Sequence, residues 1–262
     1  MRPLPHPPEY YRRLHESRHR REAKLFIAPG RKLLKEALYS LPASRFHAIL
    51  YDQSLPPPDL PTELRDKLHP LPRWQIERIS GQETPEGVVA ILIQPPLHSF
   101  PPYPPALLGE GIQDPGNLGT LLRSMEWFGY HHLWLSPESV DPFHPKVVRA
   151  SMGSLFRLRV ERIQEWSLLL SGYEGRCVVA AVDGTPAHQI DWEKYDSLYI
   201  GSEARGVSQA PAHWQRVSIP PSPTCQAESL NVAIAATLLL YLQREIKAGR
   251  LHTLPPLSPS EG

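Results

Sequence analysis

The sequence predicts two α/β domains joined by a proline-rich linker. Short apolar strands alternate with helical segments along the chain, which is the pattern of an α/β layer architecture. Residues 95–105 hold a cluster of prolines, which favours a semi-rigid, extended connection. We therefore expect an N-terminal domain over residues 1–94 with 1–9 disordered, the linker over 95–105, a second domain over 106–250, and a disordered tail over 251–262.

The composition of the 262-residue chain suits globular domains and excludes several other classes. A hydrophobic content of 41% allows a packed core, and nothing resembles a signal peptide or a membrane span. Two cysteines, Cys177 and Cys225, are too few for a disulfide framework or a zinc site, and they favour a reducing compartment. The paired His131 and His132 lack the spacing of helical metal ligands. We expect a cytoplasmic protein without a metal site.

In the N-terminal domain, apolar segments predict strands over residues 25–28, 46–51 and 88–93, and helices over 31–38 and 62–67. A run of basic residues begins before the first strand, although the net charge of the chain is only +1. Such a run is either a solvated helix surface or a patch that neutralises phosphates and gives salt-sensitive affinity. Under the second interpretation the contacting residues are Arg12, Arg13, Arg18, Arg20, Arg21 and Lys24.

In the second domain, strands are predicted over residues 106–108, 132–135, 178–182, 198–200 and 217–219. A helix over 118–128 ends at Gly129 as its C-cap. A second helix, over 232–242, is apolar on every side, which indicates burial, and it is too short to span a bilayer. The alternation predicts a mostly parallel sheet, which binds ligands at the carboxyl ends of its strands.

Three polar motifs lie in the loops of this second domain. They are GIQDPGNLGTLLRSMEWFGY (residues 111–130), LYIGSEARGVS (198–208) and the triplet Ser229-Leu230-Asn231. A lone triplet of this kind is usually only a helix cap. In this order and spacing, however, the three motifs together resemble those of the SpoU (TrmH-like) family of RNA ribose 2′-O-methyltransferases, in the SPOUT superfamily.

The resemblance implies more than composition or periodicity can show. It implies a deep trefoil knot in the second domain, a homodimer formed through that domain, and S-adenosylmethionine as the cofactor. Residues 139–160 also match the family, in which this connection flanks the active site. The N-terminal segments KLFIAPGRKLLKEAL and QETPEGVVAIL resemble the family's substrate-binding domain, which is similar to an RNA-binding ribosomal-protein fold. Two departures are visible: Pro29 replaces an acidic residue before Gly30, and the loop over 219–229 is longer by about two residues.

By the same resemblance, the functional polar residues are Asn117, Arg123, Glu203, Ser229 and Asn231, and the cofactor slot forms at Gly201, Ile219 and Leu230. Arg123 has two possible roles. It is either the acceptor of the hydroxyl proton, which its high pKa opposes, or a bidentate clamp on a phosphate. In the second case Glu203 is the proton acceptor.

The leading prediction is therefore an enzyme that methylates a ribose 2′-hydroxyl of RNA, most consistently ribosomal RNA. Two alternatives stay open: the same reaction on transfer RNA, and a non-catalytic RNA-binding paralogue. The presence of Arg123, Asn117 and Asn231 disfavours the paralogue. A Rossmann-type nucleotide binder is disfavoured because no G-x-G-x-x-G sequence opens a helix.

Overall fold

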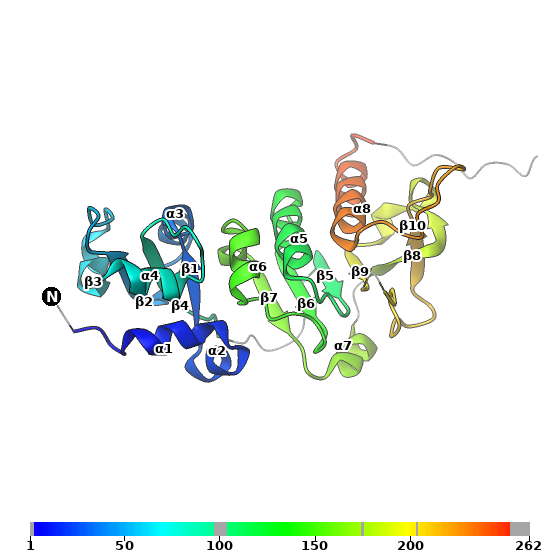
Figure 1. The fold of residues 1–262 in the computed structure, drawn as a ribbon. Coiled ribbons are helices and arrows are strands. Elements are labelled where there is room, and N and C mark those ends of the chain that lie inside the picture. The colour runs from blue at the N-terminus through cyan, green and yellow to red at the C-terminus, as the bar shows by residue number, and fades with distance from the viewer. Residues whose placement is uncertain (1–2, 97–103, 174–175, 203, 252–262) are drawn as a thin grey trace, which may run out of the picture. The chain divides into compact units, whose positions relative to one another are not determined.

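The computed structural model describes residues 3–96, 104–173, 176–202 and 204–251. The chain divides into two compact units (Figure 1). The first combines Met1–His98 with Asp141–Arg157, and the second combines Ser99–Val140 with Leu158–Gly262. The segment Asp141–Arg157 thus belongs to the first unit, although it follows the start of the second unit in sequence.

The first unit is built on a four-stranded sheet with the order β1-β4-β2-β3. Its strands are β1 (Leu25–Pro29), β2 (Phe46–Asp52), β3 (Leu68–Leu71) and β4 (Val88–Ile93). The central strand β4 is antiparallel to β1 and β2, while β2 and β3 are parallel. Three of the four strands match the sequence prediction. The strand β3 was not predicted, since its four residues include a proline and a histidine.

Short helices surround this sheet. They are α1 (Pro8–Arg12), α2 (Ser17–Ala23), α3 (Arg31–Ser40), α4 (Arg73–Ser80) and α6 (Pro145–Ala150), with 3-10 turns at Arg13–His15, Ala43–Arg45, Thr62–Lys67 and Ser154–Phe156. The predicted helix over 31–38 is confirmed. The one over 62–67 is a 3-10 helix, and α4 was not predicted.

The N-terminus is more ordered than the sequence suggested. Disorder was expected for residues 1–9, but α1 begins at Pro8, and Leu4 packs against the core of the first unit. Tyr11 and Leu14, which follow directly, are completely buried in that core. Apolar side chains among the prolines therefore hold this segment in place. Residues 1 and 2 lie outside the described part of the chain.

The second unit contains a six-stranded sheet with the order β10-β8-β9-β5-β6-β7. Every neighbouring pair in it is parallel, which confirms the predicted type of sheet. Its strands are β5 (Ala106–Gly109), β6 (His132–Leu135), β7 (Arg159–Arg162), β8 (Cys177–Pro186), β9 (Ser197–Ile200) and β10 (Gln215–Ser218). Only β7 was missed, because its alternating charged residues resemble a surface segment.

The helices of the second unit are α5 (Pro115–Phe128), α7 (Trp166–Gly172) and α8 (Val232–Lys247), with 3-10 turns at Ala187–Gln189 and Trp192–Lys194. Asp114 caps α5 by accepting from the Asn117 amide at 2.7 Å, and Pro115 occupies the first turn, where no amide donor is needed. Gly129 ends α5 with a φ of 81°, which confirms the predicted C-cap.

The prediction that the last helix is buried on all sides is wrong. Ile234, Leu238 and Tyr241 of α8 are 49%, 40% and 43% exposed. Their spacing of four and three residues places them on one face of the helix. The opposite face, with Ala236, Leu239 and Leu240, is buried.

Parts of two predicted segments lie outside the described residues: 97–103 of the linker and 252–262 of the tail. Among the residues that are described, no helix is long and apolar enough to cross a membrane.

Candidate active site

The three motifs meet at one edge of the parallel sheet. The first motif follows β5, which ends at Gly109, and the second begins within β9, which ends at Ile200, and continues into the loop after it. These strands are direct neighbours, with Gly109 paired to Ile200. The third motif lies in the loop after β10, which ends at Ser218. Since all strands run the same way, the three loops leave the carboxyl edge of the sheet, where such folds bind their ligands.

The first and third motifs are joined by a hydrogen bond between asparagine side chains. Asn231 Nδ2 donates to Asn117 Oδ1 at 2.9 Å. The Oδ1 atom of Asn231 accepts from the amides of Ala233 (3.0 Å) and Ile234 (3.3 Å), so Asn231 is also the N-cap of α8. The cap interpretation and the functional interpretation of Asn231 are therefore compatible, because each uses a different end of the amide.

Asn117 lies in α5 and Asn231 caps α8, and these two helices pack side by side (Figure 1). Ser124 and Thr237 share a hydrogen bond of 2.6 Å between their hydroxyls. At the other end, Tyr130 donates to the buried Gln243, which in turn donates to the Tyr195 carbonyl at 2.8 Å. Burial raises the pKa of Tyr130, so this phenol stays protonated and able to donate. These bonds fix the register of the two helices and thereby the positions of Asn117 and Asn231.

The first and second motifs are joined through Glu110, which sequence analysis missed. This carboxylate is buried and accepts hydrogen bonds from Tyr199, from the Ser208 hydroxyl, and from the Ser208 amide at 3.1 Å. Burial, and then the bond to Glu110, raises the pKa of Tyr199. The sequence signal that could have revealed Glu110 is a charged residue directly after an apolar strand. Glu110 holds the end of the second motif against the start of the first.

The turn of the second motif depends on the absence of a side chain at Gly201. A Cβ atom there would lie 1.9 Å from the Gly206 carbonyl oxygen and 2.4 Å from the Val207 nitrogen. The Gly206 amide donates to the Ser202 carbonyl at 2.8 Å, which closes the turn. Gly201 is therefore required by close packing of backbone on backbone, as is usual where a strand end must approach another chain segment.

The loop of the first motif is anchored by two serines after β6. Gly111, with a φ of 64°, donates its amide to Ser136 Oγ at 2.9 Å. The Ile112 amide donates to Ser139 Oγ at 3.1 Å, and the Ile112 carbonyl accepts from the Val140 amide at 2.9 Å. Both serines are buried. These bonds define the path of the chain that leads to Asp114 and Asn117.

The other predicted site residues lie on the same loops or helices. Arg123 projects from an exposed position of α5, between the buried Leu122 and Met125. Ser229 is exposed in the loop before α8, where Leu230 is 46% exposed, and Ile219 directly follows β10. Glu203 lies outside the described residues. The structure thus brings Asn117 and Asn231 into contact, and it places Arg123 about one and two-thirds helical turns beyond Asn117 on the same helix.

One predicted phosphate contact is wrong. Arg20 is only 1% exposed, and its guanidinium is hydrogen-bonded inside the first unit to Asp141 and to two backbone carbonyls. It therefore cannot reach a phosphate without unfolding its surroundings. Arg12, Arg13 and Arg18 form exposed ion pairs with Glu9, Glu16 and Glu22 of neighbouring helical turns. Arg21 and Lys24 are exposed.

The fold and this edge define a two-unit α/β protein with a loop site at the carboxyl end of a parallel sheet. Residues 105–241 match the SpoU rRNA methylase family, and residues 9–90 match the MRM3-like substrate binding domain. The chain belongs to the SpoU rRNA methylase family, which confirms the resemblance seen in the three motifs.

Several relatives are similar over most of the chain. The 23S rRNA (guanosine-2′-O)-methyltransferase RlmP of Bacillus subtilis is 30% identical, over 88% of this chain and 93% of its own. An uncharacterised tRNA/rRNA methyltransferase of Synechocystis is 38% identical, over 64% of each chain. A solved structure assigned to the TrmH family of RNA methyltransferases, from Porphyromonas gingivalis, has a TM-score of 0.75 at 31% identity, covering 91% of this chain and 97% of that one. An AdoMet-bound rRNA methyltransferase from Sinorhizobium meliloti has a TM-score of 0.76 at 25% identity, covering 94% and 97%.

Proposed function

We propose that this protein transfers the methyl group of S-adenosylmethionine to a ribose 2′-hydroxyl of ribosomal RNA. Family membership and the joining of the three motifs at one sheet edge support the reaction. The substrate class is supported by the MRM3-like substrate binding domain and by the Bacillus subtilis relative, which is named for 23S ribosomal RNA and covers nearly the whole chain. Transfer RNA is the weaker alternative, because the Bacillus subtilis relative that covers nearly the whole chain is named for ribosomal RNA.

The residues at the edge suit the cofactor. Gly201 lets two backbone segments approach closely, and backbone N–H and C=O groups at strand ends can recognise an adenine ring. Leu230 and Ile219 leave apolar surface partly exposed. We assign the slot to Gly201, Ile219 and Leu230, with the longer proline-rich loop over 219–229 as the part most able to alter affinity. When bound, the sulfonium supplies an electrophilic methyl group.

The chain's own residues bind and orient the ribose. Holding a hydroxyl at near-attack distance contributes about 7–11 kcal/mol, so positioning is the largest contribution available to these side chains. Asn117, Asn231 and Ser229 supply amide and hydroxyl groups at the sheet edge. Arg123, exposed on α5, either clamps the neighbouring phosphate or accepts the hydroxyl proton, and Glu203 is the acceptor in the first case.

RNA affinity comes from the N-terminal basic residues other than Arg20. The pairs of Arg12, Arg13 and Arg18 with glutamates are exposed, and exposed pairs contribute only about 0–1 kcal/mol. A phosphate can therefore replace the carboxylate at little cost. Together with Arg21 and Lys24, these residues give a contact whose strength falls with salt.

We further propose a homodimer formed through the second unit. The exposed apolar face of α8, with Ile234, Leu238 and Tyr241, supports it. So does Trp127 of α5, which is 79% exposed and whose carbonyl accepts a bond of 3.4 Å from Arg244 of α8. A trefoil knot closed by α8 and a location in the cytoplasm complete this proposal, both by analogy with the family.

The reaction is tested with purified protein, tritiated S-adenosylmethionine and three unmodified RNAs made in vitro: 23S ribosomal, 16S ribosomal and total transfer RNA. Incorporation into one ribosomal RNA, at a single nucleotide resistant to alkaline hydrolysis, is the expected result. Arg123→Ala is the matched inactive control. Label in transfer RNA alone would select the alternative substrate. Cofactor binding without label in any RNA would select the non-catalytic RNA-binding protein.

The dimer is tested by light scattering on the full chain and on the double variant Leu238→Arg/Trp127→Arg. Two charges on the exposed apolar face should convert a dimer into a monomer, because a charge buried without a partner is strongly unfavourable. The exposed Leu168→Arg on α7 is the control and should leave the dimer intact. A wild-type monomer that methylates RNA would exclude this assembly.

A further inference from the structure

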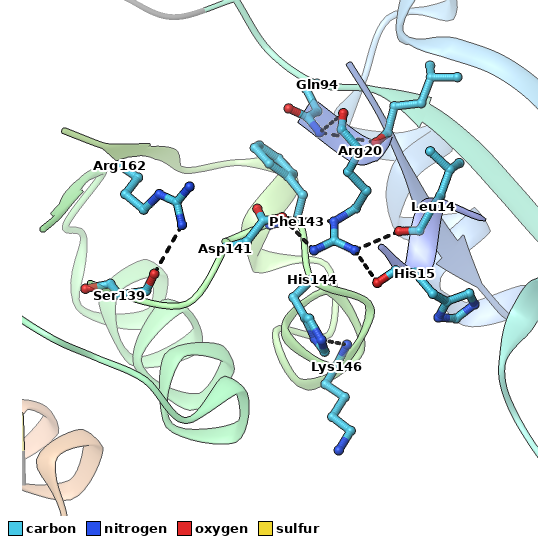
Figure 2. Close-up of polar contacts among 11 residues, drawn as sticks. Leu14, His15, Arg20, Gln94, Ser139, Asp141, Phe143, His144, Lys146 and Arg162 are labelled. Atoms are coloured by element: carbon cyan, nitrogen blue, oxygen red, sulfur yellow. Dashed lines mark hydrogen bonds and ion pairs between the residues drawn. The ribbon is translucent and has the colours of Figure 1, made fainter. Parts of the chain in front are cut away.

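The guanidinium of Arg20 is buried and forms an ion pair with Asp141 in the first unit (Figure 2). Its Nε and Nη2 atoms donate to Asp141 Oδ2 at 2.9 and 2.7 Å. Its Nη1 atom donates to the carbonyls of Leu14 (2.7 Å) and His15 (2.8 Å). A guanidinium can donate five hydrogen bonds, so four bonds satisfy it nearly completely. The pair joins α2 to a residue 121 positions further along the chain.

A buried ion pair is weak evidence for stability. Removing two charges from water costs about as much as their attraction returns, and well-packed apolar residues often stabilise a fold equally well. The best-attested use of such pairs is to fix one arrangement of the chain against alternatives.

Asp141 is the first residue of Asp141–Arg157, the segment that belongs to the first unit. Its Oδ1 atom also accepts from the Phe143 amide at 2.9 Å, and the Phe143 ring lies 5.0 Å from that of Phe26 in β1. At the far end of the segment, Arg157 donates to Glu36 (2.8 Å) and Ser40 (2.9 Å) of α3. The segment is therefore attached to the first unit at both of its ends.

The residues directly before Asp141 are attached to the first motif. Val140 donates to the Ile112 carbonyl at 2.9 Å, and Ser139 Oγ accepts from the Ile112 amide at 3.1 Å. The Ser139 carbonyl accepts from Arg162 at 3.3 Å (Figure 2). Val140 is thus hydrogen-bonded to the first motif, whereas the next residue, Asp141, is hydrogen-bonded to Arg20. A single peptide bond therefore joins a residue held by the first motif to a residue held by Arg20.

We propose that Arg20 and Asp141 are positioning residues for methyl transfer. By fixing Asp141, the Arg20 guanidinium fixes Ser139 and Val140, and these hold Ile112 and the loop that carries Asp114 and Asn117. A basic residue of the N-terminal run therefore acts on the reaction through the backbone instead of through a phosphate. This inference rests on the proposed function.

The first test needs no RNA. In hydrogen exchange on the full chain, Asp141→Asn places an amide donor opposite the Arg20 donors, while the bond from Phe143 to the remaining oxygen is kept. We expect faster exchange in residues 109–117 and at Val140, with unchanged exchange in α4 of the same unit. Arg20→Lys keeps the charge but offers fewer donors, and it should give an intermediate effect. Arg73→Met, which removes an exposed pair with Glu77, is the control and should change neither region.

The second test is single-turnover methylation of 23S ribosomal RNA at saturating cofactor, well below the melting temperature of each variant. Misplacement of a reacting group by about 1 Å can cost about 100-fold in rate, so we expect a loss of up to that size for Asp141→Asn and a smaller loss for Arg20→Lys. The Kd values for the cofactor and the RNA should stay unchanged.

Faster exchange in α4 together with weaker RNA binding would show that the pair only stabilises the fold. Unchanged exchange in residues 109–117 for both variants would overturn the proposal. If wild-type protein methylates no RNA, the proposed function fails, while the exchange experiment still decides whether the pair holds the loop.

Discussion

Asn231 and Asn117 contact each other through one end of the Asn231 amide, while the other end caps helix α8. The hydrogen bond to Asn117 and the capping of α8 can therefore be separated by mutation. Asn231→Asp keeps two oxygens for the cap, and a carboxylate suits a helix N-terminus, but it loses the donor to Asn117. Asn117 can restore the contact only by rotating its own amide, which changes the group that it presents at the sheet edge.

We expect Asn231→Asp to keep the melting temperature of the wild type and to lose most methylation. Asn231→Ala should lose both, with about 1 kcal/mol of stability from the missing cap. Thermal unfolding and single-turnover rates on the same samples measure the two effects. An unchanged rate for Asn231→Asp would show that the residue is a cap and nothing more. Equal destabilisation by the two variants would show that the cap and the contact to Asn117 are not separable.

Arg123 should be dispensable for folding. It projects from an exposed position of α5, and substitutions at such positions change stability by only about 0.5 kcal/mol. We expect Arg123→Ala to abolish methylation while calorimetry still detects cofactor binding. The matched control on the same helix is Thr120→Ala, which is also exposed and should retain the rate.

Arg123→Lys then distinguishes the roles of the guanidinium. Lysine keeps the charge without the planar pair of donors, so a purely electrostatic contact should be partly rescued and a bidentate phosphate clamp should not. A wild-type rate for Arg123→Ala on the true RNA would remove this residue from the mechanism.

Local signals in the sequence predicted much of the fold. The strands β5, β6 and β9 are mostly apolar because a parallel sheet is covered on both faces. Gly129 is recognisable because the C-cap needs a positive φ. Each of these features depends on residues close together in the chain. The short strand β7 lacks such a signal, since Val160 is the one fully buried residue among its four and its charges dominate the pattern.

Long-range features could not be predicted in this way. Arg20 looks like its neighbours Arg18 and Arg21 in sequence, and only Asp141, far along the chain, distinguishes it. The exposed face of α8 was missed for a related reason: an apolar helix satisfies the burial rule equally well whether its own chain or another molecule covers it. Glu110 was missed because its partners Tyr199 and Ser208 lie 89 and 98 residues away.

Gly201 should tolerate no side chain, for a steric reason. The Cβ atom of Gly201→Ala would lie 2.0 Å from the Gly206 carbonyl carbon, which is backbone and cannot rotate away. The turn must open, and overpacking of this kind costs about 1–3 kcal/mol. We expect calorimetry to show loss of S-adenosylmethionine binding in a folded protein. Gly172→Ala, where a Cβ meets nothing within 4 Å, is the control. Wild-type affinity in Gly201→Ala would place the cofactor elsewhere.

The stability of the first unit should fall on mild acidification because of two histidines in its sheet. Burial lowers the pKa of His47 in β2 and of His69 in β3 below the usual 6.5. Above that pH both groups are neutral in the folded and unfolded chain and contribute nothing. As the pH falls below it, the unfolded chain binds protons that the folded chain does not bind, so folding is progressively disfavoured until the lowered pKa values are reached.

Thermal unfolding at about pH 7.5 and about pH 5.5 should therefore show a lower melting temperature in acid, and His47→Gln/His69→Gln should reduce the difference. His213→Gln, at an exposed position of the second unit, is the control and should keep the full difference. If the double variant and the control lose the same amount of stability on acidification, the imidazoles of His47 and His69 are not its cause.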